Sequence, residues 1–407
     1  MSKLEELINQ LCPDGVEYVK LNTICSVYDG THSTPTYTES GVKFVSVENI
    51  NNLYATTKYI SEEAFNKYKI KPSVNDVMMT RIGSIGVCNV VEEEEPFAYY
   101  VSLALLRPNT TVLNSKFLKY SIESKHGRKE LRKRTLINAV PIKINKDDIG
   151  KIILPIPPLP IQEEIVRILD NMTSLTAELT AELTAELKAR RKQYEYYRDS
   201  LLSFKEGDAQ DGVRWMKLGD VARFIYGYTD KAKEQGTARY IRITDIGING
   251  YLNPQDAKYI DLNDENEKYV LQKGDLVMAR TGATYGKTLY FDSDTPSVYA
   301  SFLIKIELNT VLNNRYYWHF SKSNLYWQQA NKLVSTAGQP QFNANALANV
   351  VVPVPPLKEQ QRIVDILDRF DKLCNDISEG LPAEIEARKK QYEYYRDKLL
   401  AFKEKEV

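Results

Sequence analysis

The most regular hydrophobic pattern in the chain lies in two long segments that are typical of amphipathic helices. Over residues 161–204, apolar side chains recur at alternating steps of three and four and then at two steps of four, which predicts a coiled-coil seam with a local stutter. That seam consists of Ile165, Ile168, Met172, Leu175, Leu179, Leu183 and Leu187. A second segment, over residues 363–403, repeats the steps through Ile363, Ile366, Phe370, Leu373 and Ile377.

The length of the first helix indicates its packing partner. At about 1.5 Å per residue it would span about 66 Å, longer than a domain of this size is wide. We therefore expect the two helices to pack against each other, although each could simply cap its own domain. Gly380 and Pro382 interrupt the second pattern and predict a kink or a restart there.

Shorter patterns between the long segments predict mixed α and β modules. Alternating or short apolar runs bounded by Gly, Asn and Pro predict strands over residues 42–47, 102–107, 238–244 and 301–308. Helices are expected over about 114–125 and 313–333.

The chain repeats itself at an offset of 198 residues. ARRKQYEYYRDSLLSFKE at 189–206 matches ARKKQYEYYRDKLLAFKE at 387–404, and LPIPPLPIQEEIVRILD at 154–170 matches VPVPPLKEQQRIVDILD at 352–368. Weaker similarity links DGVEYVKL at 14–21 with DGVRWMKL at 211–218. The chain is therefore a tandem duplication in which each copy has a divergent part followed by a nearly invariant one.

Composition and charge limit the possible partners and compartments. Fifty-four Lys and Arg balance 54 Asp and Glu, so nucleic-acid contacts must come from local patches rather than from a global field. The four cysteines form no CxxC pair and there are three histidines, which argues against a zinc framework or a disulfide scaffold. The N-terminus has no apolar core of the kind a signal peptide needs and no run approaches a membrane span, so we expect a reducing, cytoplasmic setting without membrane contact.

Catalytic motifs are missing from the sequence. It contains no phosphate-binding GxxxxGK[ST] loop, no HExxH, no GxSxG and no strand–GxGxxG–helix pattern. The Gly-rich stretches 83–86 and 281–286 follow Arg81 and Arg280 at expected strand ends, where tight turns explain them. We expect no catalytic residue and no metal site on this chain.

A cluster of basic residues offers the first binding signal. Residues 116–134 hold eight Lys and Arg against two Glu, and Arg128, Arg132 and Arg134 are the candidate phosphate contacts. A solvated helix face is the alternative explanation.

Polar loops at matching places in the two copies offer the second signal. Side chains in loops 28–38 and 226–237 can hydrogen-bond bases or phosphates, and the polar stretch 335–345 matches 135–145 in the first copy. Ordinary surface loops and turn stabilisation are the alternatives. The candidate contacts, with the two strand-end arginines, are His32, Ser33, Thr34, Thr36, Tyr37, Arg81, Lys143, Tyr228, Thr229, Lys231, Lys233, Arg280, Gln339, Gln341 and Asn343.

Several of these segments together resemble the specificity subunit of type I restriction-modification systems, HsdS. The resemblance rests on PIPPLPIQEEIVRILD and PVPPLKEQQRIVDILD, on CPDGVEYVKL at 12–21, on the paired KQYEYYRD stretches and on TAELTAELTAEL at 176–187. It covers essentially the whole chain. It implies two tandem α/β (α+β) target recognition domains joined by two long antiparallel coiled-coil helices with pseudo-two-fold symmetry.

The resemblance also implies boundaries, partners and cofactors. Recognition domains would cover residues 1–153 and 211–351, and helical spacers residues 154–210 and 352–407. Each recognition domain would read half of a split double-stranded DNA target, and the spacer would dock two modification (methyltransferase) subunits, which two restriction subunits join. S-adenosylmethionine would then bind the modification subunit, and ATP and Mg the restriction subunit, with no cofactor on this chain.

Two other functions compete with this interpretation. The chain could itself be a DNA methyltransferase, but it lacks a cofactor loop and an Asn/Asp-Pro-Pro-aromatic motif. It could also be a coiled-coil adaptor that touches no DNA, which sequence-dependent DNA binding would exclude.

Overall fold

The computed structural model describes residues 2–204, 212–335, 338–376 and 380–406, which form two compact units. Unit 1 comprises residues 1–180 and 386–407, and unit 2 comprises residues 181–385. Each unit therefore contains one divergent module and parts of both long helical segments. In the described ranges, no helix combines the length and the apolar character that spanning a membrane requires.

Unit 1 is built on one four-stranded antiparallel sheet and two smaller sheets. The four-stranded sheet has the order β2-β8-β5-β6, a three-stranded sheet has the order β4-β3-β7, and β1 pairs with β9. The strands are β1 (Glu17–Lys20), β2 (Cys25–Asp29), β3 (Val42–Val45), β4 (Tyr59–Ile60), β5 (Val77–Thr80), β6 (Cys88–Val90), β7 (Phe97–Tyr99), β8 (Leu103–Pro108) and β9 (Ile153–Ile156). The helices outside the long segments are α1 (Lys3–Leu11), α2 (Glu62–Asn66), α3 (Ser115–Glu123), α4 (Lys125–Arg132) and α5 (Lys146–Ile149).

Unit 2 repeats this topology strand for strand. Its sheets have the orders β11-β17-β14-β15, β13-β12-β16 and β10-β18. The strands are β10 (Arg214–Lys217), β11 (Ala222–Tyr226), β12 (Ala238–Ile241), β13 (Tyr259–Ile260), β14 (Leu276–Ala279), β15 (Thr288–Tyr290), β16 (Ser297–Tyr299), β17 (Leu303–Leu308) and β18 (Val351–Val354), and the helices are α7 (Leu218–Val221), α8 (Asn314–Phe320), α9 (Asn324–Leu333) and α10 (Ala344–Ala348). The mixed α and β modules are confirmed, and the four predicted strands correspond to β3, β8, β12 and β17.

The predicted helix over about 114–125 is confirmed as α3, but the predicted single helix over 313–333 is wrong in one respect, because a serine divides it. Ser323 separates α8 from α9: its hydroxyl donates to the Phe320 carbonyl and accepts from the Tyr326 amide. Ser124 divides α3 from α4 in the same way. A serine whose hydroxyl hydrogen-bonds to nearby backbone groups favours the start of a new helix over continuation of the previous one. The spacing of apolar residues gives no information about such hydrogen bonds.

The long segments form one uninterrupted helix and one divided helix. Helix α6 runs over Leu159–Leu202, whereas the second segment consists of α11 (Leu357–Asn375) and α12 (Leu381–Leu399). The predicted break at Gly380 and Pro382 is confirmed.

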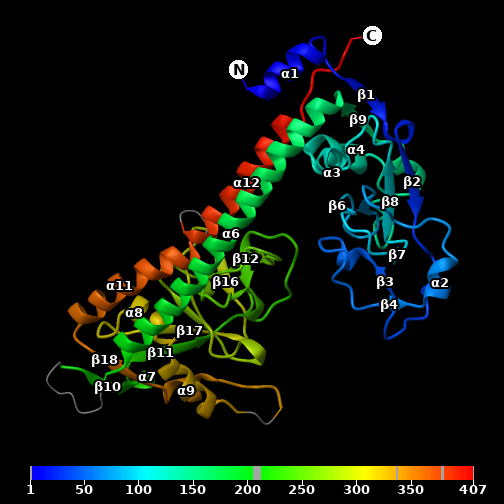
Figure 1. The fold of residues 1–407 in the computed structure, drawn as a ribbon. Coiled ribbons are helices and arrows are strands. Elements are labelled where there is room, and N and C mark those ends of the chain that lie inside the picture. The colour runs from blue at the N-terminus through cyan, green and yellow to red at the C-terminus, as the bar shows by residue number, and fades with distance from the viewer. Residues whose placement is uncertain (1, 205–211, 336–337, 377–379, 407) are drawn as a thin grey trace. The chain divides into compact units, whose positions relative to one another are not determined.

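The expectation that the long segments pack together is confirmed within each unit (Figure 1). In unit 1, the Thr173 hydroxyl of α6 donates to the Tyr392 hydroxyl of α12 at 3.0 Å. In unit 2, the ring of Tyr197 on α6 stacks on Phe370 of α11, with centroids 5.3 Å apart.

The predicted apolar seam is buried only near the ends of these helices. Ile165 and Ile363 are fully buried, but Leu175 is 65% exposed. The other seam residues are partly buried, except that Leu373 is exposed and Ile377 lies outside the described residues. Buried residues of α6 instead recur at steps of four, at 161, 165 and 169 and again at 194, 198 and 202, with Gln162, Glu164 and Val166 also buried in the first stretch. These faces pack on the cores of the units rather than along a continuous coiled coil.

A buried glutamine at the start of each long segment ties it to the neighbouring module. The side-chain amide of Gln162 donates to the carbonyls of Val112 and Pro157, and its oxygen accepts from the Asn114 amide, at 2.7–2.8 Å. Gln360 makes the same three bonds in unit 2, to Val311, Pro355 and Asn313. Both side chains are fully buried with three bonds each, so they fix the loop before α3 or α8 against the proline-rich connector.

A second polar contact in unit 2 centres on a buried histidine. His319 on α8 lies between the hydroxyl of Tyr194 (Nδ1, 3.0 Å) and the carboxylate of Asp368 (Nε2, 2.7 Å). Burial lowers the pKa of His319 from 6.5 to about 4. Burial also opposes ionisation of Asp368, but the hydrogen bond from His319 and the charge of Arg315 outweigh it and lower the Asp368 pKa. In unit 1 the corresponding carboxylate, Asp170, accepts a hydrogen bond from a tyrosine hydroxyl instead.

The buried histidine predicts that unit 2 is sensitive to acid. Between pH 6.5 and 4, His319 is protonated in the unfolded chain but not in the folded chain. As the pH is lowered through this range, the free energy of unfolding should therefore decrease by up to about 3 kcal/mol. His319→Gln should flatten this dependence. All three tryptophans (Trp215, Trp318 and Trp327) lie in unit 2, so denaturant unfolding followed by tryptophan fluorescence reports on this unit. An unchanged slope in the variant would contradict the assignment.

Candidate nucleic-acid interface

Three of the predicted segments of unit 1 meet at Arg81, directly after β5. Its Nε donates to the Ile144 carbonyl at 3.1 Å, and its Nη1 forms an ion pair with Asp29 at the end of β2. The Ile144 amide returns a hydrogen bond to the Arg81 carbonyl at 3.0 Å. Loop 28–38, the Gly-rich turn 83–86 and stretch 135–145 are therefore held together at one junction.

The same three segments meet in unit 2 at Arg280, directly after β14. Its Nε donates to the Ser301 carbonyl at 3.1 Å and its Nη1 to the Gln341 side chain at 3.4 Å. The guanidinium lies over the rings of Tyr226, at the end of β11, and Phe302, at 5.3 and 5.4 Å from their centroids. The junction is thus duplicated as a frame, although different side chains build it.

The structure changes the role predicted for Arg81. This residue is 6% exposed, and its guanidinium is occupied by Asp29 and the Ile144 carbonyl. A phosphate or a base would have to displace both partners, so the Arg81 guanidinium is not free to contact DNA in this structure. Arg280 is half-buried and packs between two partly exposed rings.

Most of the other predicted contacts lie on the surface. His32, Ser33, Thr34, Thr36 and Tyr37 in loop 28–38 are exposed, as are Thr229, Lys231, Lys233 and Gln339 in unit 2 and Lys143 in unit 1. Loops 28–38 and 226–237 begin at the last residues of β2 and β11, the strands that end at the two junctions.

Besides Arg280 and Gln341, three further predicted contacts of unit 2 have partners within the chain. Lys233 forms an ion pair with Asp261 at 2.8 Å, and this hydrogen bond raises the Lys233 pKa. The half-buried Tyr228 donates to Glu265 at 3.3 Å. Asn343 caps α10 by accepting from the Ala346 amide at 3.0 Å, which is the turn-stabilising role considered as the alternative.

The basic cluster of unit 1 divides into paired and unpaired residues. Lys133 and Arg134 both pair with the buried Glu130, whose pKa is lowered: burial opposes its ionisation, but the hydrogen bond from Lys133 and other favourable contacts outweigh that effect. Arg128 and Arg132 are exposed, and Arg128 approaches Glu393 at 3.9 Å. Of the two, Arg132 has no ion pair among the described residues.

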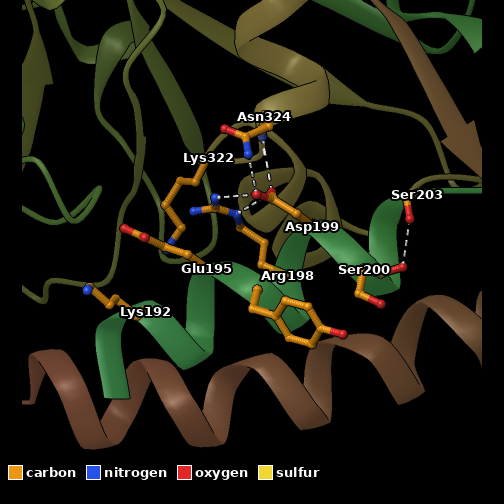
Figure 2. Close-up of a pocket in the computed structure, with 9 residues that line it drawn as sticks. Lys192, Glu195, Arg198, Asp199, Ser200, Ser203, Lys322 and Asn324 are labelled. Carbon is orange, nitrogen blue, oxygen red and sulfur yellow. Dashed lines mark hydrogen bonds and ion pairs between the residues drawn. The ribbon is translucent and has the colours of Figure 1, made fainter. Parts of the chain in front are cut away.

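An aspartate from each repeated KQYEYYRD stretch holds the helix that follows the dividing serine. In unit 1, Asp397 accepts from the Lys125 amide at the start of α4 at 2.9 Å. In unit 2, Asp199 accepts from both the backbone and the side-chain nitrogen of Asn324 at the start of α9, in the pocket that Figure 2 shows. A carboxylate at a helix N-terminus is favourable for the helix, so Asp397 also orients the basic face of α4.

The partners in these contacts were not predicted from the sequence. Asp199 and Asp397 had a signal, because the same acid occurs at the same place in both repeats. Asp29 and Tyr226 had none, since their pairing with an arginine about 50 residues away exists only in the folded module.

The junction predicts how two arginine variants should differ. Arg81→Met leaves the Asp29 carboxylate and the Ile144 carbonyl without their partner and should reduce the free energy of unfolding by about 2 kcal/mol. Arg132→Ala, at an exposed position, should change it by less than about 0.5 kcal/mol. Denaturant unfolding followed by circular dichroism measures both. Unchanged stability of Arg81→Met together with lost DNA binding would show that Arg81 is a direct contact after all.

Comparison with known proteins identifies a matching family model and several relatives. The family model for the type I restriction modification DNA specificity domain matches residues 13–189 and 211–387. The specificity subunit of the Escherichia coli enzyme EcoR124I/EcoR124II is 38% identical over 281 residues, covering 63% of this chain and 64% of that subunit. A putative specificity subunit from Haemophilus influenzae, S.HindORF215P, is 40% identical over 271 residues, covering 64% of this chain and 66% of that one. The match thus spans just under two thirds of the length of these two relatives.

Solved structures share the fold at low sequence identity. A chain from a study of complex assembly and conformational transition in a type I R-M system has a TM-score of 0.68 at 18% identity, covering 96% of this chain and 98% of that one. The HsdS subunit from Thermoanaerobacter tengcongensis has a TM-score of 0.51 at 17% identity, covering 96% of each chain. The two segments that the family model matches are offset by 198 residues, which is the offset of the sequence repeat. The chain belongs to the family of type I restriction-modification DNA specificity domains and carries two of these domains in tandem.

Proposed function

We propose that this chain reads a bipartite double-stranded DNA target, with one half-site for each recognition domain. The observation that carries the proposal is the duplicated junction: in each unit, an arginine at a strand end holds together a polar exposed loop, a Gly-rich turn and a second loop. The shared frame keeps the loops in place, while the side chains on them differ between the copies. Such an arrangement suits two recognition surfaces that share a fold and differ in the bases they read.

The recognition domains in this proposal cover residues 1–153 and 211–351. Exposed polar side chains of loops 28–38 and 226–237 and Gln339 supply the base contacts, and cations of α4 hold phosphates, which position the protein without reading sequence. The spacers cover residues 154–210 and 352–407.

The spacers would also dock the partner subunits. In both KQYEYYRD stretches a pair of adjacent tyrosines, Tyr196 with Tyr197 and Tyr394 with Tyr395, is exposed. Exposed aromatic side chains at equivalent places suit two copies of one partner. We assign these surfaces to two modification subunits that bind S-adenosylmethionine and carry out methylation; two restriction subunits with ATP and Mg complete the complex, and the chain itself is not catalytic.

Exchange of one recognition domain tests the proposal. Residues 1–153 are replaced by the corresponding segment of another specificity subunit, the chimera is assembled with its modification subunits, and methylated sites are mapped. We expect one half-site to change while the other half-site and the gap stay the same. The unmodified chain in the same assembly is the control. Changes in both half-sites, or methylation by this chain without a partner, would contradict the proposal.

A deletion within α6 tests the spacer. Removing residues 184–187, one TAEL unit, shortens the helix by about 6 Å and rotates the remainder of the helix by about 40° beyond a full turn. B-DNA advances about 3.4 Å and twists about 34–36° per base pair, so the unread gap should shorten by about one to two base pairs with both half-sites intact. Glu182→Gln, which keeps the length, should leave the gap unchanged. Methylation mapping that showed altered half-site bases would exclude a spacer role.

A further inference from the structure

The loop between α4 and α5 presents apolar side chains to solvent. Val140 is 99% exposed and Ile137 66%, and Leu136 and Ile142 are 44% and 40% exposed. This stretch was predicted to be one of two matched polar segments, whereas these four apolar side chains are exposed and only Ile144 turns into the core. Four large exposed apolar side chains within seven residues form a local patch, unlike single exposed residues elsewhere on a surface.

Hydrogen bonds at the base of the loop hold it in this position. The Leu136 amide donates to the Lys143 carbonyl at 2.8 Å, and the Ala139 amide donates to the Leu136 carbonyl at 3.2 Å. Gly83 in the Gly-rich turn donates to the Ile142 carbonyl at 2.9 Å. The loop is therefore pinned to the Arg81 junction, and its tip, residues 137–140, stays exposed rather than folding back onto the core.

Cations flank the apolar tip on both sides along the chain. Arg132 precedes the loop and Lys143 closes it; both are exposed, and neither has an ion pair among the described residues. An apolar tip between unpaired cations complements a polyanion whose interior is apolar. Duplex DNA has this character, because phosphates line its outside and stacked bases its inside, and proteins that kink DNA insert apolar side chains between base steps.

The corresponding loop of unit 2 has the same frame and carries different side chains in its described residues. Gln341 pairs with Ser335 and Thr281 there, as Lys143 pairs with Leu136 and Ile82 in unit 1. Its described residues carry the exposed amide of Gln339, and the one large apolar side chain, Phe342, is buried. Unit 1 thus presents an apolar tip, and the described residues of the unit 2 loop present the amide of Gln339.

We propose that residues 137–140 form a wedge that inserts between neighbouring base pairs of the half-site read by unit 1, while Arg132 and Lys143 hold the flanking phosphates. The proposal rests on the proposed function, since it needs unit 1 to contact DNA. It adds a mode of recognition: unit 1 reads the ease with which a base step opens, and unit 2 reads hydrogen-bonding groups through Gln339.

The test uses the full chain assembled with its modification subunits and a duplex carrying the mapped target. In Ile137→Ser/Val140→Ser, affinity for this duplex should fall about 10- to 100-fold, while the slope of log affinity against log salt stays the same because no cation is lost. Arg132→Ala should instead reduce that slope by about 0.9. A series of duplexes carries one 2-aminopurine each, placed in turn along this half-site but never at the base that is methylated. The unmodified complex should raise the 2-aminopurine fluorescence at one of these positions, and the double variant should not.

Two further variants separate the wedge from general surface effects. Val74→Ser removes another exposed apolar side chain of unit 1 and should bind as the unmodified chain does. Ile137→Leu/Val140→Leu keeps an apolar tip and should retain binding and the fluorescence change. The leucine variant thereby shows whether the serine variant lost apolar contact or lost its fold.

The possible outcomes distinguish this proposal from the proposed function. If the unmodified complex binds the target specifically and the serine variant binds within about twofold of it, the wedge is wrong and the proposed function stands. If the serine variant no longer assembles with the modification subunits, the loop is a protein-docking surface and the wedge is also wrong. If the unmodified complex shows no sequence-dependent binding, both proposals fail together.

Discussion

The buried glutamine at the start of each long helical segment is the constraint on which the rest of each unit depends. Gln162 and Gln360 each satisfy two backbone carbonyls and one amide in the interior, so loss of the side chain would leave three backbone groups without partners. These bonds fix the loop that starts α3 or α8 against the proline-rich connector. The dividing serine and the aspartate of the KQYEYYRD stretch then set the direction of the next helix, which in unit 1 carries the basic face.

The two copies keep the backbone contacts of this scheme and change the side chains around it. The arginine after β5 or β14 binds a carboxylate in unit 1 and lies over two aromatic rings in unit 2. The carboxylate facing α3 accepts from a tyrosine hydroxyl, whereas the one facing α8 accepts from a histidine whose pKa is lowered by burial. Frames made of backbone hydrogen bonds tolerate such changes, because the geometry they impose does not depend on which side chain lies outside them.

Much of the fold was predictable from the sequence, and the candidate site only in part. The repeat, four strands and the break at Gly380 and Pro382 followed from local patterns, because repeats, strand periodicity and proline act over short distances. The division of α8 from α9 at Ser323 did not follow, since a serine within an apolar pattern is compatible with a helix interior and with a helix start. Exposure of the polar loops was predictable from composition. Their meeting at Arg81 and Arg280 was not, because Asp29, Arg81 and Ile144 are distant in sequence.

The middle of α6 shows why a four-residue repeat can persist within a helix that is otherwise anchored. Among residues 170–193 none is buried, and Leu175 is largely exposed, so this stretch contributes little to either core. Its helical state depends instead on Ala, Glu and Leu, which have high helix propensity. An insertion or deletion within 161–169 or 194–202 would move buried side chains out of their cores. A change of four residues between these two stretches leaves each buried side chain packed in the core of its own unit. The length of this helix can therefore vary without loss of either fold, which is the physical condition that a spacer of adjustable length has to meet.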